Sequence, residues 1–158
     1  MDWAGWLIFG FIATIILTAV MTGAQLAGIS RMDLPLMLGT ILFDNPDRAR
    51  VVGVLIHVVN GQVFALLYAA AFAAIGRSTW WMGALFGAIH GVAALTLIVP
   101  LLPGIHPRMA SERSGPSMRA VLEPPGWMAL NYGGATPAVA LVAHVIYGTI
   151  LGTFLSPQ

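Results

Sequence analysis

The chain contains no cysteine and no lysine, and charged residues make up only 8% of its 158 residues. Without cysteine the protein cannot form a disulfide. It also has no thiolate for a zinc site, an iron–sulfur cluster or a covalently attached c-type haem. A metal or cofactor would therefore need ligands from histidine, methionine or oxygen atoms.

Two broad function classes are also disfavoured. The net charge is only +1 and the basic residues are seven scattered arginines, whereas phosphate binding needs a basic patch, so we expect no nucleic-acid partner. The chain has no G-x-S-x-G motif, no phosphate-binding glycine loop with a lysine, and no paired carboxylates in its apolar segments. Because these are the groups that hydrolytic and phosphoryl-transfer chemistry uses, we do not expect catalysis by the isolated chain.

Apolar sequence is abundant, with 58% hydrophobic residues. The charged residues fall in short clusters that leave four long uncharged stretches, and a helix of about 20 mostly apolar residues crosses a hydrocarbon core about 30 Å thick. The sequence therefore predicts an all-α integral membrane four-helix bundle with up-down-up-down topology, in a single transmembrane domain covering residues 1–158. The expected spans are residues 3–29, 48–75, 79–102 and 136–155.

The connections between spans carry their own signals. Ser30 or Asp33 can cap a helix and Pro35 suits its first turn, so we expect a short interfacial helix after the first span. Residues 103–134 hold five Pro and five Gly, which predicts an irregular loop between the third and fourth spans and the best docking surface for a partner.

Arginine placement predicts the orientation. One arginine, Arg77, lies on one side, whereas the two longer connections hold all the others, and the positive-inside rule places arginine-rich connections in the cytoplasm. We expect a multi-pass protein of a bacterial or archaeal inner membrane with both termini outside. The first span should be retained, because Met1-Asp2-Trp3 lacks a basic n-region. The arginines of the longer connections are Arg31, Arg48, Arg50, Arg108, Arg113 and Arg119.

Three histidines, His57, His90 and His144, lie inside the predicted spans without a charged partner. An ionisable residue inside a membrane is a functional hypothesis by default. His57 and His144 lie at similar depth in the second and fourth spans, which are diagonal in this topology, so they could be the axial ligands of a b-type haem. A metal ion between them is a related possibility, with His90 as a third ligand.

Neighbouring residues could complete such a cofactor site. Gly61 and Gly148, each one turn after a histidine, would leave room for a porphyrin, and Asn60 or Tyr147 could orient the imidazoles. Arg48 or Arg50 could meet the propionates. The structural alternative is that each histidine hydrogen-bonds to a neighbouring helix and only stabilises the bundle.

Other polar and small residues are interpreted structurally. Gly10, Thr14, Thr18 and Thr22 recur at four-residue spacing and predict a helix-packing face rather than a polar conduit. His90 lies on the same helix surface as Gly83 and Gly87, so its primary interpretation is a close contact with another helix. His106 is expected to be a solvated loop residue. Methionine is expected to fill gaps rather than to bind copper(I).

The segments MDLPLMLGT (residues 32–40), HVVNGQVFALLY (57–68) and HVIYG (144–148) resemble a family of small bacterial and archaeal four-span proteins of unknown function, distantly similar to the YagU-like inner-membrane proteins. The resemblance covers roughly residues 5–75 and 135–155. It implies the four-span fold and the prominence of His57 and His144, but no activity. His90 and residues 103–134 have no counterpart in the family pattern.

Three functions follow as hypotheses. The first is a non-catalytic accessory or packing subunit of a larger membrane assembly, such as an energy-transducing complex, with lipids and other membrane subunits as partners. The second is the b-type haem protein described above, acting in electron transfer or redox sensing. The third is a small-solute or lipid carrier that uses a polar surface formed by Thr14, Thr18, Gln25 and Asn60.

Overall fold

The structure is a computed structural model that describes residues 2–111, 118 and 121–156. Within these residues four helices are long and apolar enough to cross a membrane, which confirms the predicted all-α bundle and its four spans. Arg113 and Arg119, two of the arginines behind the predicted orientation, lie outside the described residues. The candidate spans are Trp3–Leu26, Pro46–Ile75, Trp80–Ile105 and Thr136–Phe154.

Three of the spans are continuous helices: α1 (Trp3–Leu26), α3 (Pro46–Ile75) and α6 (Thr136–Phe154). The third span consists of α4 (Trp80–Ala93), a π-helical turn η1 (Ala94–Ile98), a 3-10 turn η2 (Val99–Leu101) and α5 (Leu102–Ile105). The short helix α2 (Leu34–Gly39) follows α1, and the 3-10 segment η3 (Trp127–Tyr132) precedes α6.

Side-chain caps explain where the helices begin. Asp33 caps α2 by accepting a hydrogen bond from the Leu36 amide at 2.9 Å, as its position before Pro35 predicts. Asn45 accepts from two amides at the start of α3, where Pro46 is the first helical residue. At the other end of α3, Gly76 takes the left-handed conformation with φ 72°, which lets the chain turn directly into α4.

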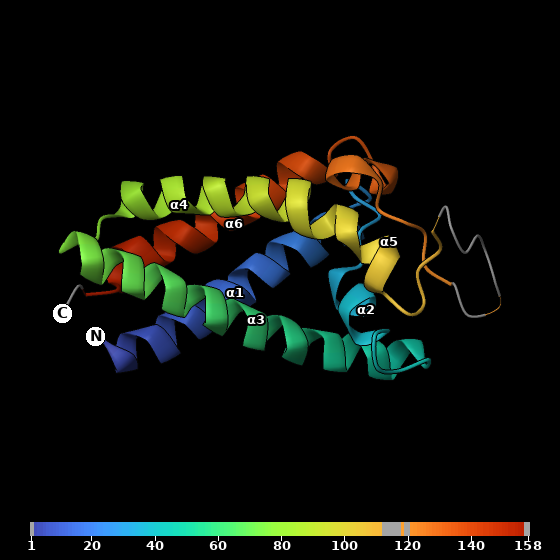
Figure 1. Ribbon diagram of the computed structural model, residues 1–158, viewed down its shortest axis with the longest axis horizontal. Coiled ribbons are helices and arrows are strands. Elements are labelled where there is room, and N and C mark those ends of the chain that lie inside the picture. Colours follow the sequence, from blue (N-terminus) through green and yellow to red (C-terminus); the bar gives the residue numbers. More distant parts are fainter. Residues whose placement is uncertain (1, 112–117, 119–120, 157–158) are drawn as a thin grey trace.

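The spans are arranged unevenly. Helix α1 packs between α3 and α6, and α4 packs along α6. Although α3 and α4 are consecutive, they diverge from the turn that joins them, and α2 and α5 occupy the wide end between them (Figure 1). Near the turn, α3 and α4 still meet through side chains, since the rings of Phe72 and Phe86 stack with centroids 5.4 Å apart, and the two helices separate toward the other end.

Glycines bring α4 and α6 to backbone distance. A Cβ added at Gly83 would collide with the backbone of Gly148, and one at Gly87 would collide with the backbone of His144. Further along, Gly152 lies against Gly83 in the same way. Because lipid provides no hydrophobic drive between helices, close packing of small residues is what holds such a pair together.

The predicted small-residue face of α1 does pack against α3. Gly10 lies against Gln62 and Ala65, and Thr14 lies against Gly61. The hydroxyls are satisfied within α1, since Thr14 Oγ1 donates to the Gly10 carbonyl at 2.7 Å. This face is therefore a helix contact, as the spacing predicts.

His106 corrects one prediction. It is not a solvated loop residue, because only 6% of it is exposed. Its Nε2 donates to the Met37 carbonyl in α2 at 2.8 Å, and its Nδ1 accepts from the Arg108 amide at 3.1 Å. Arg108 in turn donates to Asp44 and to the Thr40 carbonyl, so these two residues attach α2 to the end of α5.

A second set of contacts joins the segment after α1 to η3. The Arg31 amide donates to the Tyr132 carbonyl at 2.7 Å, and the Arg31 guanidinium pairs with Glu123 at 3.1 Å. The Tyr132 hydroxyl donates to the Glu123 carbonyl at 2.6 Å. Burial, with the Glu123 carboxylate as a smaller cause, raises the pKa of Tyr132 to about 12, so this phenol remains a donor at neutral pH.

The α4–α6 contact generates a first prediction. Gly148→Ala should destabilise the protein by about 1–3 kcal/mol, because the new methyl group must push α4 away from α6. Gly23→Ala is the matched control, since Gly23 is helical and nothing lies near its added Cβ. It should leave stability unchanged or raise it by about 0.5–1 kcal/mol. The measurement is reversible unfolding in mixed detergent micelles, and equal effects of the two substitutions would contradict the packing described.

The contacts of His106 generate a second prediction. His106→Ala leaves the Arg108 amide without its acceptor and the Met37 carbonyl with only the Thr40 hydroxyl as a donor, and it should cost about 1–3 kcal/mol in the same unfolding assay. Ile105→Ala, which changes a neighbouring side chain that is 75% exposed, should cost less. A His106 variant as stable as wild type would show that α2 is held by other contacts.

Candidate functional site

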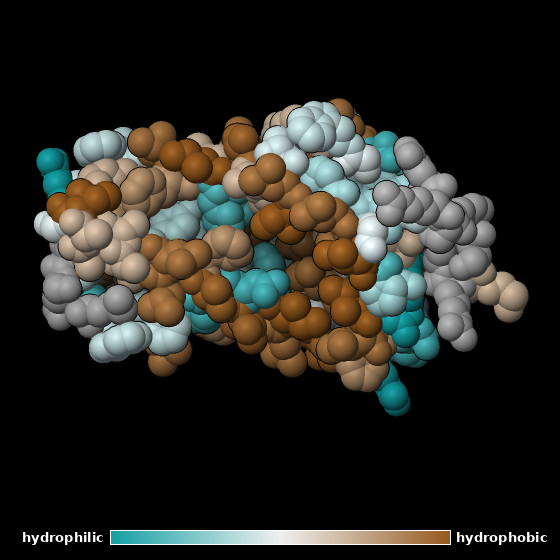
Figure 2. Space-filling model, viewed as in Figure 1, coloured by the Kyte–Doolittle hydropathy of each residue, from teal (hydrophilic) through white to brown (hydrophobic). Residues whose placement is uncertain are grey.

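A cavity of about 160 Å³ lies where α3 and α4 diverge. All four spans and α2 contribute to its walls. Its lining includes Asn60 on α3 and Ile98 on η1, both of which are exposed at the lipid-facing surface, so the cavity reaches that surface between the two helices. Figure 2 shows hydrophilic residues in a hollow on this face, surrounded by apolar surface.

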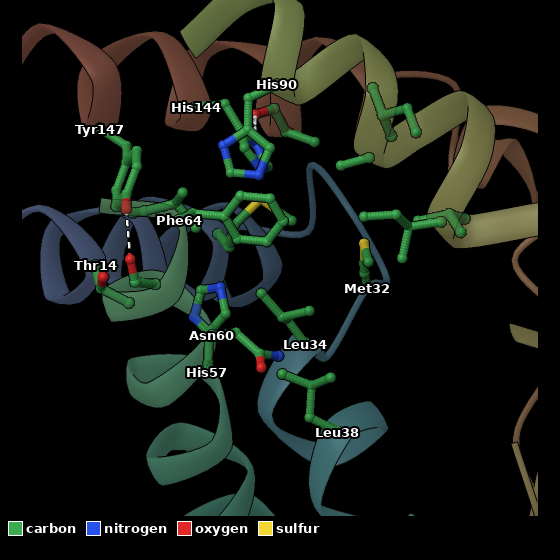
Figure 3. Close-up of a pocket in the computed structure, with 18 of the residues that line it drawn as sticks. Thr14, Met32, Leu34, Leu38, His57, Asn60, Phe64, His90, His144 and Tyr147 are labelled. Atoms are coloured by element: carbon green, nitrogen blue, oxygen red, sulfur yellow. Dashed lines mark hydrogen bonds between the residues drawn. The ribbon is translucent and has the colours of Figure 1, made fainter. Parts of the chain in front are cut away.

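The three intramembrane histidines all line this cavity, from three different helices (Figure 3). His57 comes from α3, His90 from α4 and His144 from α6. The sequence predicts that His57 and His144 face the centre of the bundle, and the structure brings both to the same cavity. It also brings His90, which is the closer neighbour of His144: their ring centroids are 4.7 Å apart at an interplanar angle of 80°.

The tautomer of His57 follows from its partner on α1. Thr18 Oγ1 donates its only hydrogen to the Thr14 carbonyl at 2.8 Å. It can therefore only accept at its 2.8 Å contact with His57 Nδ1. His57 carries its proton on Nδ1, and its Nε2 is left as an acceptor.

His144 reaches the same state by a different route. Its Nδ1 lies 2.7 Å from the Ala140 carbonyl, one turn earlier in α6. A carbonyl oxygen can only accept, so the proton is on Nδ1 here as well, and Nε2 keeps its lone pair. An N–H held by a backbone carbonyl in this way fixes the direction of the ring.

His90 lies in an aromatic cluster. Its ring is 4.1 Å from that of Phe64 and 6.0 Å from that of Tyr147. Its Nδ1 is 3.4 Å from the hydroxyl of Tyr68, a buried residue whose hydroxyl has no other hydrogen-bond partner in the described part of the chain. In this long contact either the hydroxyl or the ring nitrogen can be the donor, so it does not fix the tautomer of His90.

Gly61 and Gly148 do not lie open as room for a porphyrin. A Cβ at Gly61 would meet the Thr14 side chain, and one at Gly148 would meet the backbone of Gly83 and Gly87. Both glycines are used in helix–helix contacts.

Tyr147 and Asn60 also take positions other than the predicted ones. The Tyr147 hydroxyl donates to the Gly61 carbonyl at 2.6 Å and so joins α6 to α3 without orienting an imidazole. Asn60 lines the outer part of the cavity, is exposed, and makes no hydrogen bond within the described residues.

The π-helical turn η1 shapes the cavity wall next to His90. Pro100 has no N–H to donate to Thr96, and the Val99 amide donates back five residues to Ala94. The wider turn places Ala94, Leu95 and Ile98 around the cavity. Single π-helical turns are rare and occur frequently at functional sites.

This arrangement gives little support to a metal-binding or haem-binding site. Within the described residues no group of three or more His, Cys, Asp or Glu is placed to hold a metal ion. In Figure 3 the Phe64 ring lies between His57 on one side and His90 with His144 on the other, where a porphyrin between His57 and His144 would have to pass. Arg50, proposed for a propionate, pairs with Asp33 at 2.9 Å.

Several partners in the site were missed by sequence reasoning. The pairing of His90 with His144 depends on the glycine contact between α4 and α6, and the G-x-x-x-G spacing of Gly83 and Gly87 was the available signal. The π-helical turn had a weaker signal in Pro100. Nothing in the sequence indicated that Thr18 would meet His57.

Comparison with known proteins finds no family model, no curated protein and no solved structure that matches this chain. The interpretation of the cavity therefore depends on its own chemistry.

The hydrogen bonds of the histidines generate a third prediction. In protein labelled with ¹⁵N-histidine, His57 and His144 should each show a single neutral tautomer with the proton on Nδ1. Thr18→Val removes the acceptor of His57 and should convert its signal to a tautomer mixture, while His144 is unchanged. Thr22→Val, on the same helix, is the control. A His57 tautomer unaffected by Thr18→Val would contradict the assignment.

Proposed function

We propose that this multi-pass membrane protein binds a small amphipathic molecule that enters from the lipid between α3 and α4. The observation that carries the proposal is the cavity itself, which has polar histidine nitrogens on its inner walls and reaches the lipid-facing surface. The site differs from the one in the carrier hypothesis of the sequence analysis: of the four polar residues named there, Thr14 and Asn60 line the cavity, whereas Thr18 and Gln25 are not among its lining residues.

The position of the cavity supports access from the membrane. His57, His90 and His144 each lie within a span, so the cavity is at membrane depth. Asn60 and Ile98 of its lining are exposed, whereas the three histidines are only partly exposed. A molecule with an apolar tail can leave the tail in the lipid while its polar end reaches the imidazoles.

The chemistry of the walls supports a ligand with one polar end. Most of the lining is apolar, including Leu17, Leu95 and Leu102, and these side chains offer no hydrogen bonds. Polar groups at membrane depth are costly unless they are satisfied, and they mark binding sites in membrane proteins. His90 and His144 lie together on one side of Phe64 and His57 lies on the other (Figure 3), and all three imidazoles meet this description.

The size of the cavity supports a single-ring ligand and not a haem. An engineered apolar cavity of about 150 Å³ binds one benzene molecule. The cavity here, at about 160 Å³, is similar in volume, while a porphyrin joins four such rings. The cavity is therefore too small for a haem.

An accessory subunit of a larger membrane assembly is the second candidate, and Asn60 favours it. This side chain is exposed on a membrane-spanning helix and has no hydrogen-bond partner in the described residues. A neighbouring subunit could supply that partner. Purification from native membranes under mild conditions tests this candidate, which fails if the protein always migrates alone or only with itself.

We also propose the orientation of the protein in the membrane and its relation to a known family. The charged ends of α2 and α3 and the loop that contains Arg108 lie at one end of the bundle, opposite the two termini (Figure 1). Under the positive-inside rule this end faces the cytoplasm of a bacterial or archaeal inner membrane. Kinship with the YagU-like four-span proteins is compatible with these features.

Photoaffinity labelling tests the binding function and provides a fourth prediction. A decylbenzene that carries a diazirine on its ring is added to the full chain in phosphatidylcholine nanodiscs. Saturable labelling should concentrate on cavity residues such as Ala94, Leu95 and Met32. An excess of unlabelled decylbenzene should suppress it.

Two substitutions on the third span make the test specific. Ala94→Phe fills the cavity and should remove the saturable labelling. Val92→Phe adds the same ring on the same helix at a side chain that is 47% exposed, away from the cavity, and should label like wild type. Labelling that never saturates, or that persists in Ala94→Phe, would refute the proposed binding site.

A further inference from the structure

The cavity presents hydrogen-bond acceptors without partners. Nε2 of His57 and Nε2 of His144 make no hydrogen bond within the described residues, because each ring uses its N–H elsewhere. Among the described residues, Gln62 Oε1 is the one fully buried side-chain N or O atom without a hydrogen-bond partner. The two Nε2 atoms have no partner either, so they cannot be fully buried. They can be reached from the cavity that both histidines line.

These two acceptors come from diagonally placed helices. His57 is on α3 and His144 on α6, on either side of Phe64 in the view of Figure 3. A ligand that satisfies both must therefore carry two hydrogen-bond donors directed to different sides. One donor group at the end of a chain could satisfy only one of them.

The third histidine can offer either polarity. Its contact with the Tyr68 hydroxyl does not fix the tautomer, so His90 Nε2 can donate or accept. A hydroxyl group can donate to an imidazole nitrogen and accept from an imidazole N–H. The three rings together therefore match hydroxyl groups better than carbonyls, which only accept, or amines, which are usually charged.

The remaining surface suits an aromatic ring. Phe64, His90 and Tyr147 form an aromatic cluster with ring centroids 4.1 Å and 6.0 Å from His90. Stacked and edge-to-face contacts with such rings favour an aromatic guest. The cavity volume of about 160 Å³ holds one ring of benzene size.

Building on the proposed function, we infer that the bound molecule is a lipid-soluble hydroquinone. Its ring lies beside the Phe64 ring in the cavity between α3 and α4, and its two hydroxyls reach past that ring, one donating to His144 Nε2 and the other to His57 Nε2. Its apolar tail leaves the cavity past Asn60 and Ile98 into the lipid. No oxidation or reduction is part of this assignment.

The site should discriminate by hydrogen-bond donors. An oxidised quinone has the same ring but only carbonyl oxygens, whose lone pairs would face the two imidazole lone pairs. A dimethyl ether of the hydroquinone also lacks both donors. A site built to bond a hydroxyl binds an analogue without it less well, because its polar groups are left unpaired.

The experiment titrates three probes into the full chain, labelled with ¹⁵N-histidine, in bicelles under inert gas. The probes are decylhydroquinone, its dimethyl ether, and decylbenzoquinone. Decylhydroquinone should bind about tenfold more tightly than either other probe and should shift the Nε2 signals of His57 and His144. Equal affinity for all three probes, or unmoved Nε2 signals at saturation, would overturn the inference.

Two variants identify the acceptors. His57→Leu and His144→Leu should each weaken hydroquinone binding about tenfold while leaving the affinity for the ether unchanged. Both should fold, since Thr18 still donates to Thr14 and the Ala140 carbonyl stays within its helix. Val59→Leu, at a side chain of α3 that is 61% exposed, is the matched control and should bind like wild type.

The outcomes separate the two proposals. If the diazirine probe labels the cavity and the ether binds as well as the hydroquinone, the binding function stands and the hydroquinone assignment fails. If neither unlabelled decylbenzene nor any of the three probes competes with the diazirine probe at the cavity, both fail. Loss of hydroquinone preference in the histidine variants alone, with the ether unaffected, supports both.

Discussion

The backbone contact between α4 and α6 is the constraint on which the rest of this structure depends. Glycines at positions 83, 87, 148 and 152 let the two helices approach until no Cβ would fit between them. Such contacts hold helices together in lipid, where apolar side chains gain nothing by leaving the solvent. Because α4 packs against α6 along its length, it diverges from α3 (Figure 1). The cavity lies between α3 and α4.

The polar groups around that cavity follow one physical pattern. Thr14 and Thr18 donate to carbonyls of their own helix, and so does His144 through Nδ1. Donors are thus satisfied locally, as the hydrocarbon environment requires, whereas the acceptor nitrogens of His57 and His144 remain free. A cavity that holds unmatched acceptors at membrane depth is well suited to a ligand that brings donors with it.

Predictions from the sequence were most successful where interactions between residues close together in the chain decide the structure. The helix start at Asp33–Pro35 and the packing face at Gly10 and Thr14 were confirmed because capping and four-residue spacing are local properties. It was wrong about His106, whose loop position indicated solvent. The Met37 carbonyl that buries this ring is 69 residues away in the chain, and no local signal points to it.

The amino-acid sequence alone determined four membrane-spanning helices and the presence of three histidines at membrane depth, since hydrophobic length and the cost of charge in lipid are read along the chain. Only the tertiary structure decided that His90 joins His144, that Gly61 and Gly148 serve helix contacts, and that Thr18 directs the ring of His57. These outcomes depend on how far each helix rotates and tilts against its neighbours. That is set by the summed packing of several helices at once, which no single segment encodes.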